Sequence, residues 1–274
     1  MTKDCLRTEG DILTENGIRL HLRHSTLQMQ IYKSITSTNT VLKKLAENGA
    51  AEGTVLLAEE QTAGRGRMNR SFYSPAQSGL YMSLLLRPRM GAQEAAHITS
   101  CAAVAVAQAI EVLTGTKAEI KWVNDVLING KKVCGILTES AIDGETGWPQ
   151  YVIVGIGINV RPPRGDFPAE LAEIAGALPP VPETKDLRCR LAADILDRLM
   201  DFYERLPAED CYEEYKKRSC ILGREIHILQ LGKEPVAATA LDIEPDFSLR
   251  VRLNDGTETC LMSGEVSIRR YDPR

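Results

Sequence analysis

The sequence lacks the features that mark several common classes of protein. Its seven cysteines are odd in number, scattered and without a CxxC pair, and its four histidines do not cluster. A disulfide-stapled scaffold, a thiolate zinc site and a protein-held transition metal are therefore disfavoured, and a reducing compartment is expected. No uninterrupted apolar run reaches the ~18–20 residues that a membrane span requires, so we expect no membrane segment.

An excess of positive charge is also missing. The 33 Lys and Arg residues are outnumbered by 37 Asp and Glu residues, which gives a formal net charge of −4 at pH 7. This balance argues against a strongly basic nucleic-acid-binding body. The start, MTKDCLRTEGD, contains acids and no apolar stretch, so we expect no secretory signal and a cytoplasmic location.

What the chain does contain is a mixture of helix and strand patterns, in 274 residues that are 43% hydrophobic. Apolar spacing and capping residues predict three helices. The first follows the N-cap candidates Ser37-Thr38-Asn39 and stops at Asn48-Gly49, and the others cover residues 94–114 and 187–202. Short apolar runs predict strands over residues 55–58, 80–86, 122–128, 131–138 and 152–160. The pair Asn129-Gly130 is typical of a tight hairpin turn between two of them. We therefore expect an α/β domain over residues 27–221, preceded by a polar lead-in, residues 1–26.

The pattern changes after Gly223. Strand-like runs recur about every ten residues from Arg224 to Arg270, with turn signals between them. In one of these runs, Leu249, Val251 and Leu253 alternate with two arginines. This alternation predicts a second, small β-barrel domain within residues 222–274.

The most unusual segment is Gln61–Arg70, which carries three arginines and no acid in an acidic protein. Its glycines, Gly64 and Gly66, would let the backbone approach a ligand closely. Guanidinium groups suit bidentate contacts with carboxylate or phosphate. A solvated basic loop is an equally good interpretation of this segment alone. The segment does not match GxxxxGK[ST], so a P-loop nucleotidase is not indicated.

Two further segments could carry chemistry. Lys121–Asp125 combines a cation, an amide and a carboxylate that could hold phosphate, a base edge and Mg²⁺, although a charged strand end is the simpler interpretation of it alone. Gly155–Asn159 would admit a flat ligand beside a strand, but Pro162 and Pro163 follow in place of the helix that dinucleotide binding requires. Cys134 is expected to be a core residue rather than a nucleophile.

Taken together, these segments resemble the biotin–protein ligases. The resemblance rests on Ser37-Thr38-Asn39, Gln61 to Arg67, Ser74-Pro75, Leu80-Tyr81, Lys121 to Asp125, Lys132 to Leu137 and Gly155 to Asn159. It extends from about residue 28 to residue 270 in the family's order and spacing. It implies an α/β (α+β) catalytic domain with a mixed sheet, related to class II aminoacyl-tRNA synthetases, and a C-terminal SH3-like barrel. It also implies that biotin is activated with ATP and Mg²⁺ to biotinyl-5′-AMP and passed to a lysine of a biotin carboxyl carrier protein.

The resemblance further implies roles for individual residues. Biotin would be bound by Ser37, Thr38, Asn39, Gln61, Gly64, Arg65, Arg67, Lys132, Gly135 and Gly155. ATP and the adenylate would be bound by Arg65, Arg67, Lys121, Asn124, Asp125 and Asn159, with Mg²⁺ near Asp125. Catalytic roles would fall to Arg67, Lys121, Asp125 and Lys132. The sequence departs from the family's pattern at Thr36, Asn69, Phe72 and Val123, where an acid, glycine, tryptophan and proline are usual.

Two other functions are alternatives to a biotin–protein ligase. A lipoate or octanoate ligase shares the adenylation chemistry, but Ser37, Thr38 and Gln61 suit the ureido ring of biotin better than an alkyl chain. A biotin-responsive DNA-binding repressor would need a helix-turn-helix of about sixty residues, whereas residues 1–26 alone precede the expected catalytic domain. We therefore expect no specific DNA binding and no membrane partner, and a homodimer is compatible with the sequence.

Overall fold

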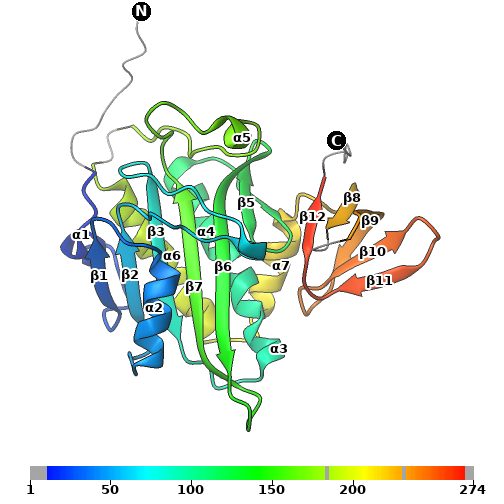
Figure 1. The fold of residues 1–274 in the computed structure, drawn as a ribbon, viewed down its shortest axis with the longest axis horizontal. Coiled ribbons are helices and arrows are strands. Elements are labelled where there is room, and N and C mark those ends of the chain that lie inside the picture. Colours follow the sequence, from blue (N-terminus) through cyan, green and yellow to red (C-terminus); the bar gives the residue numbers. More distant parts are fainter. Residues whose placement is uncertain (1–10, 183–184, 230–232, 269–274) are drawn as a thin grey trace, which may run out of the picture.

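A mixed seven-stranded sheet forms the centre of the larger part of the chain (Figure 1). The computed structural model describes residues 11–182, 185–229 and 233–268. The strands lie in the spatial order β1 (Gln28–Tyr32), β2 (Thr54–Ala58), β3 (Gly79–Leu86), β7 (Pro149–Asn159), β6 (Lys131–Ile142), β5 (Asp125–Ile128) and β4 (Glu119–Lys121). Strands β1 and β2 run parallel, and the other neighbouring pairs are antiparallel. The predicted mixed sheet is confirmed.

Helices cover both faces of this sheet. Alternation along β3 and β7 sends Leu84 and Ile156 into the large core, and Leu85 and Ile153 into a smaller core against α2. The large core includes the buried faces of α4 and α6. The helices are α1 (Glu15–Arg19), α2 (Thr38–Glu47), α3 (Ala92–Ala95), α4 (His97–Thr114), α5 (Ala169–Ala172), α6 (Leu187–Tyr203) and α7 (Glu209–Arg218), with a 3₁₀ turn η1 (Arg67–Asn69). The three predicted helices correspond to α2, to α3 with α4, and to α6.

The Ala-rich helix differs from its prediction in being divided at Ala96 into α3 and α4. Its predicted end before Gly115, whose φ of 65° is left-handed, is confirmed. By length and composition alone, Ala92–Thr114 could cross a membrane, contrary to the expectation drawn from uninterrupted apolar runs. However, 61% of its most apolar window is buried inside the fold, and α4 packs against α6 and α7. Burial in the core therefore accounts for its composition.

The predicted strands are present, but one of them begins later than expected. Strand β5 starts at Asp125 rather than at Trp122, because Lys121 at the end of β4 pairs directly with Asp125. Trp122–Asn124 must therefore form the turn between these antiparallel strands, and Trp122 is buried instead of extending the sheet. Asn129 and Gly130 form the predicted hairpin turn with positive φ angles of 51° and 73°. Strands β1 and β4 were not predicted, because both are short and largely polar.

The C-terminal part is a separate five-stranded antiparallel sheet (Figure 1, right). Its strands are β8 (Glu225–Leu229), β9 (Val236–Ile243), β10 (Leu249–Leu253), β11 (Glu258–Leu261) and β12 (Glu265–Ser267), in the spatial order β11-β10-β9-β8-β12. A small β domain is thus confirmed, while its SH3-like closure and the exact domain boundaries stay predictions. Residues 230–232 and 269–274 of the predicted barrel lie outside the described residues. The sheet packs on the larger part through Phe247, whose ring contacts His97, Tyr212 and Tyr215.

The N-terminal lead-in is attached to the larger domain over the residues that are described. Ile18 of α1 is fully buried, and the Asp11 backbone oxygen accepts a hydrogen bond of 2.5 Å from the Arg188 guanidinium. The Asp197 carboxylate of α6 accepts hydrogen bonds from the backbone N–H groups of Arg23 and His24. Residues 11–26 therefore pack as part of this domain, and residues 1–10 lie outside the described residues.

Candidate active site

A patch without side chains lies on the α2 face of the sheet. It is formed by Gly135 of β6 and by Gly155 and Gly157 of β7, and Gly135 pairs directly with Gly157. A Cβ atom added at Gly155 would lie 2.0 Å from Asn39 Oδ1, and one at Gly157 would lie 2.6 Å from the Phe72 ring. A side chain at Gly155 or Gly157 would therefore displace its neighbours, whereas a Cβ at Gly135 would lie 3.0 Å from the end of the Lys132 side chain. These three residues, here called the glycine patch, leave a flat floor against which a ligand could lie.

The wall at one end of the glycine patch is made by the start of α2. Ser37 caps this helix, and its hydroxyl accepts a hydrogen bond from the Thr40 N–H. The Thr38 N–H donates to Gln61 Oε1 at 2.9 Å, and the Gln61 amide donates to Ser74 Oγ at 3.0 Å. The predicted residues Ser37, Thr38, Asn39 and Gln61 are thus brought together as a group of uncharged donors and acceptors.

Two members of this wall were not predicted, Ser83 and Glu139. Ser83 Oγ lies 2.6 Å from Asn39 Oδ1 and 2.7 Å from Thr38 Oγ1, and Asn39 Nδ2 donates to Glu139 Oε2 at 2.9 Å. The Asn39 side chain is therefore fully used in holding the wall together. Ser83 could have been found in the sequence as the one serine within an apolar strand run, whereas nothing local distinguishes Glu139.

The segment Gly64–Phe72, here called the arginine loop, is tied down by each of its three arginines to a different element. Arg65 Nη1 lies 2.8 Å from Glu139 Oε1 on β6, and Arg67 Nη1 donates to Asn124 Oδ1 at 3.0 Å. Arg70 Nη1 lies 2.6 Å from Glu265 Oε1 on β12. These guanidinium groups therefore have protein partners, but the side chains of Arg65 and Arg70 remain 43% and 60% exposed, so the loop is both anchored and solvated.

The arginine loop covers the glycine patch. Its backbone is a narrow hairpin in which Arg65 and Ser71 form a β-bridge. Gly64 closes tightly on the Phe72 backbone, since a Cβ there would lie 2.3 Å from the Phe72 oxygen. The Phe72 ring rests over Gly135 and Gly157, and the cavity that remains is about 20 Å³, the room of one water molecule. The Phe72 side chain thus fills the space above Gly135 and Gly157. This is one of the positions where the sequence departs from the pattern that it resembles, in which tryptophan is usual.

The other end of the glycine patch is charged. Lys132 Nζ lies 2.6 Å from Asp125 Oδ1 and 3.0 Å from where a Gly135 Cβ would stand. The Asn124 amide donates to the Ile136 backbone oxygen at 2.7 Å and accepts from Arg67. Asn124, Asp125, Lys132 and Arg67 therefore form one group of cations, carboxylate and amide.

Two predicted residues are less closely placed. Asn159 lies on the same face of β7 as Gly157, but its amide donates to the Gly176 backbone oxygen at 2.9 Å. Lys121 stands opposite Asp125 in the sheet, and no hydrogen bond or ion pair among residues 11–182, 185–229 and 233–268 links its side chain to the charged group. The structure therefore brings together three of the six predicted nucleotide-binding residues, Arg67, Asn124 and Asp125, while Arg65 pairs with Glu139 of the wall.

Two titratable side chains on β3 and β6 are buried, Tyr81 opposite Gly157 and Cys134 in the large core on the other face of the sheet. Burial raises the pKa of the Cys134 thiol far above its ordinary value, so it is a core residue, as its sequence context predicted. Burial also raises the pKa of Tyr81 to about 12, and its hydroxyl donates to the Pro75 backbone oxygen at 2.9 Å. Neither group can act as a nucleophile at neutral pH.

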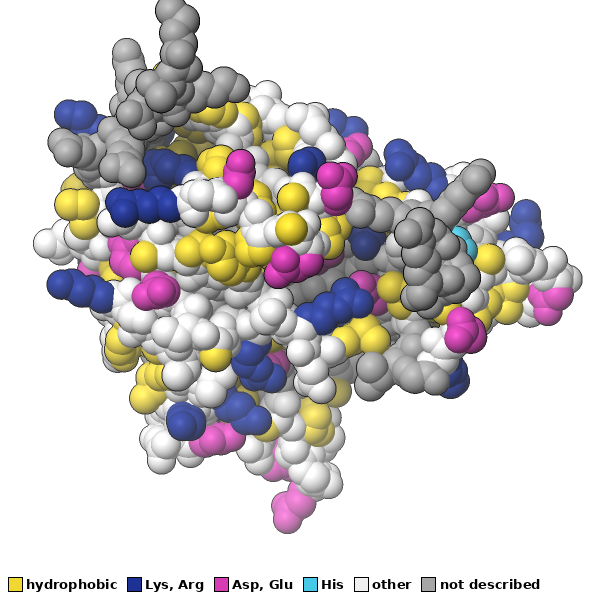
Figure 2. Space-filling model, turned by 45° about the horizontal axis from the view of Figure 1, so that its top comes forward, with side chains coloured by type: hydrophobic (Ala, Val, Ile, Leu, Met, Phe, Trp, Pro, Cys, Tyr) yellow, Lys and Arg dark blue, Asp and Glu magenta, His cyan; other side chains and the backbone are white. Residues whose placement is uncertain are grey.

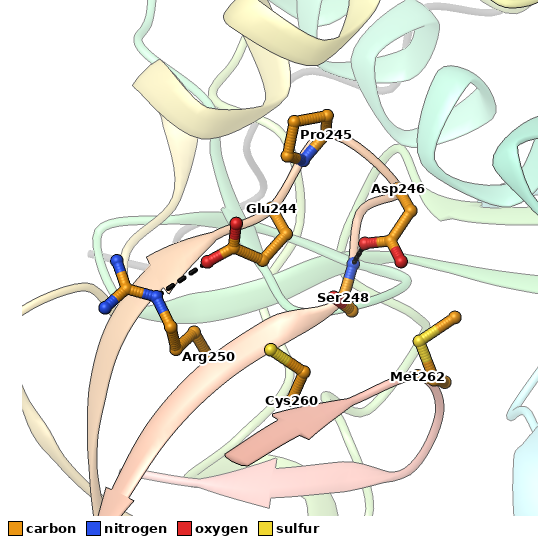
Figure 3. A pocket seen from close by; sticks show the side chains of 7 residues that line it. All are labelled: Glu244, Pro245, Asp246, Ser248, Arg250, Cys260 and Met262. Atoms are coloured by element: carbon orange, nitrogen blue, oxygen red, sulfur yellow. Dashed lines mark hydrogen bonds and ion pairs between the residues drawn. The ribbon is translucent and has the colours of Figure 1, made fainter. Parts of the chain in front are cut away.

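A wider hollow of about 690 Å³ lies on the C-terminal sheet (Figure 3). It is lined by Glu244, Pro245, Asp246, Ser248, Arg250, Cys260 and Met262. Its charged groups are already engaged, since Arg250 Nε lies 2.6 Å from Glu244 Oε1 and Asp246 accepts from the Ser248 N–H. The glycine patch, with its convergent polar groups at both ends, is the stronger candidate for the active site.

Similar proteins also point to the glycine patch as the active site. Residues 31–159, which contain the glycine patch, match the family described as biotin/lipoate A/B protein ligase. A biotin–[acetyl-CoA-carboxylase] ligase from Paracoccus denitrificans is 44% identical over 74% of this chain and 82% of its own length. A bifunctional ligase/repressor BirA from Bacillus spizizenii is 48% identical over 61% of this chain, and the match spans 51% of that protein.

The fold is shared with solved structures as well. The biotin protein ligase from Aquifex aeolicus in complex with biotin and ATP has a TM-score of 0.70 and 27% identity over 89% of this chain and 99% of that chain. On its sequence and its fold, the chain belongs to the biotin protein ligases of the biotin/lipoate A/B protein ligase family.

Proposed function

We propose that the chain is an ATP-dependent biotin–protein ligase, which forms biotinyl-5′-AMP and transfers biotin to a lysine of a biotin carboxyl carrier protein. The polarity of the glycine patch carries this proposal. Uncharged donors and acceptors, including Thr38 and Gln61, stand at one end, where the charges of Arg65 and Glu139 neutralise each other. Lys132, Asp125 and Arg67 stand at the other end. Biotin has the same polarity, with a neutral ureido ring at one end and a carboxylate at the other. The names of the relatives support this assignment.

The first step requires positive charge at the carboxylate end. The biotin carboxylate attacks the α-phosphorus of ATP, a new P–O bond forms, and pyrophosphate leaves with the electrons of the broken bond. Both reactants are anions, so cations are needed to stabilise the transition state. Lys132 lies at this end of the patch, and Arg67 is bonded to the neutral amide of Asn124. Arg65 and Arg70, in contrast, are neutralised by Glu139 and Glu265. We therefore assign the phosphate contact to Arg67 and a loop-anchoring role to Arg65.

Mg²⁺ would enter this site together with ATP. No group of three or more His, Cys, Asp or Glu side chains within the described residues is arranged to hold a metal. Mg²⁺ commonly uses one or two protein carboxylates and completes its coordination with phosphates and water. Asp125 is the carboxylate of the charged group and fits this requirement, with Asn124 beside it. When bound, the ion would reduce the negative charge of the phosphates.

The second step needs no covalent attachment to this chain. The neutral amine of the carrier lysine attacks the acyl carbon, the C–O bond to phosphate breaks, and AMP leaves. Closure of the arginine loop would keep water away from the reactive anhydride until the lysine arrives. Cys134 takes no part in this step, because it is fully buried in the large core, out of reach of a substrate.

The proposal is tested by substrate-dependent release of pyrophosphate. The chain is expected to release pyrophosphate from ATP with biotin and to add the mass of biotin to a biotin carboxyl carrier domain. Lipoate or octanoate in place of biotin is expected to give neither product. Release with octanoate but not with biotin would replace the proposal by the lipoate-type alternative.

The requirement for a residue without a side chain at position 155 can be tested by replacing Gly155 with alanine. Because the new Cβ would lie 2.0 Å from Asn39 Oδ1, Asn39 must move away from Ser83 and Glu139. The loss of about one hydrogen bond in the wall predicts about tenfold weaker biotin binding by calorimetry. Gly144, where an added Cβ meets nothing within 4 Å, is the matched control position, and its alanine variant should bind biotin as the wild type does. Equal affinity in the two variants would contradict this role of the wall.

Specific DNA binding is expected to be absent. Within the described residues, the segment before β1 holds the five-residue helix α1, which packs against α6, and a recognition helix needs a larger helical unit. On the face shown in Figure 2, Lys and Arg side chains are interspersed with Asp and Glu and form no continuous basic area. A fluorescence anisotropy titration with DNA from upstream of the organism's biotin genes, in the presence of biotin and ATP, should show at most weak, sequence-indifferent binding. A sub-micromolar complex that survives competitor DNA would contradict this prediction.

Two further assignments are part of the proposal. We place the enzyme in the cytoplasm, which is supported by the six free cysteines among the described residues. Homodimer formation stays a prediction, and sedimentation with and without biotin and ATP tests it.

A further inference from the structure

The arginine loop is attached to the C-terminal sheet as well as to the larger domain. Arg70, which follows the 3₁₀ turn at the tip of the loop, pairs with Glu265, the first residue of β12, at 2.6 Å. The Arg70 side chain is 60% exposed and that of Glu265 is 22% exposed. A single exposed ion pair thus links the cover of the glycine patch to a different sheet.

The C-terminal sheet itself is held firmly beside the active site. The Trp122 indole donates to the Phe247 backbone oxygen at 2.9 Å, and these residues are only 3% and 6% exposed. The Tyr215 hydroxyl donates to the Val123 backbone oxygen at 3.1 Å, and its ring packs on Phe247 at 5.4 Å between centroids. Because these contacts are buried, we expect the C-terminal sheet, with Glu265, to keep its position while the arginine loop moves relative to it.

The loop must move before a ligand can reach the glycine patch. With the Phe72 ring over Gly135 and Gly157, the remaining cavity of about 20 Å³ is far below the several hundred Å³ of ordinary ligand sites. The Arg65–Glu139 pair lies at the base of the hairpin, beside the bridge to Ser71, whereas the Arg70–Glu265 pair lies at its tip. Exposed ion pairs are weak and screened by salt, so the tip contact can break and re-form with each opening.

We propose that Glu265 is a positioning residue that latches the arginine loop shut through Arg70, so that the C-terminal sheet sets how fast biotin enters and leaves. This inference rests on the function proposed above. The latch joins two residues that lie outside the glycine patch, and in this proposal it re-forms when the loop closes over biotin. Its removal is therefore expected to raise the association and dissociation rate constants of biotin together, each about two- to fivefold, with a smaller change in affinity.

The test compares Glu265→Gln with Glu258→Gln in the full chain. Glu258 is the matched control, because it pairs with Arg252 at 2.8 Å in the same sheet without touching the arginine loop. The first measurement is the rate of tryptic cleavage after Arg65, Arg67 or Arg70 in the ligand-free chain, which follows the population of the open loop. The second is stopped-flow association and dissociation of biotin. Glu265→Gln should accelerate both processes about two- to fivefold, Glu258→Gln should not, and 0.5 M salt should bring the wild type to the rate of Glu265→Gln.

The possible results separate the latch from the proposed function. If Glu265→Gln and Glu258→Gln behave alike while the wild type binds biotin, the latch is wrong and the ligase function stands. If the wild type does not bind biotin, the ligase function is wrong, and the cleavage rates alone decide whether the loop is latched. Should Glu265→Gln fail to fold by circular dichroism, Arg70→Gln removes the same pair from the other side, with cleavage scored after Arg65 and Arg67. Unchanged cleavage in that variant likewise overturns the proposal.

Discussion

Replacing Lys132 with alanine is expected to slow the formation of biotinyl-5′-AMP about 10²–10³-fold, because one cation is lost where negative charge is rearranged. The Lys132 ammonium lies 2.6 Å from the Asp125 carboxylate at the charged end of the glycine patch. A charge-assisted contact made in the transition state contributes about 2–4 kcal/mol, which corresponds to this factor. Single-turnover release of pyrophosphate in the presence of biotin measures the step directly.

The fold should survive this change, and a neighbouring lysine provides the control. Backbone groups hold this part of β6, since the Lys132 N–H donates to the Ile174 oxygen and the Lys132 oxygen accepts from the Gly176 N–H. Lys131 is adjacent in sequence, but its Nζ donates to the Ala172 backbone oxygen at 3.0 Å on the exposed surface. Lys131→Ala is therefore expected to release pyrophosphate at the wild-type rate. If Lys132→Ala does so too, Lys132 has no part in adenylation.

Arg67→Gly is expected to shorten the lifetime of bound biotinyl-5′-AMP about 10- to 100-fold and to change the affinity for biotin much less. The Arg67 guanidinium donates to a neutral amide oxygen, that of Asn124, so its charge remains available for a phosphate. Hydrogen bonds to charged groups contribute about 1.5–3 kcal/mol, and free biotin has no phosphate to make this contact. Dissociation of purified, labelled biotinyl-5′-AMP gives the lifetime, and calorimetry gives the biotin affinity.

A glycine in the loop also adds backbone freedom, so a second variant is needed. Arg67→Gln removes the charge and keeps a side chain of similar reach, and it should shorten the adenylate lifetime nearly as much. If Arg67→Gly alone shortens it, loop flexibility rather than charge explains the effect. If both variants retain the adenylate as long as the wild type, the phosphate contact is not made by Arg67.

Local sequence signals predicted most of the framework. Ser37 caps α2 and Asn129-Gly130 makes the β5–β6 turn, because both depend on the backbone within a few residues. The start of β5 was misplaced, because the pairing of Lys121 with Asp125 leaves Trp122–Asn124 as a turn. That pairing is a property of the sheet, and apolar periodicity cannot reveal it.

The contacts within the candidate site were harder to predict, because they join residues far apart in the sequence. Arg65 and Glu139 are 74 positions apart, and Arg70 and Glu265 are 195 apart. The arginines form a visible cluster in the sequence, but their partners carry no local signature, so the Arg65–Glu139 contact could not be predicted. The predicted contacts of Arg65 with biotin and the adenylate stay untested. The ligand roles of the individual residues stay predictions until the variants above are measured.

The order of strands in the sheet has a consequence for how this protein folds. Strands β5, β6 and β7 are consecutive in sequence and pair as an antiparallel meander that carries Gly135 and Gly157. The start of α2 and the arginine loop come from earlier in the chain and meet that meander where β3 pairs with β7. Short-range strand pairings generally form faster than long-range ones. We therefore expect the β5–β7 meander and the earlier part of the chain to fold first, and the pairing of β3 with β7 to form late in folding. A ligand that binds only the joined form stabilises it by RT ln(1 + [L]/Kd), and biotin would thus act on this enzyme as a folding ligand that favours docking of the β3–β7 junction.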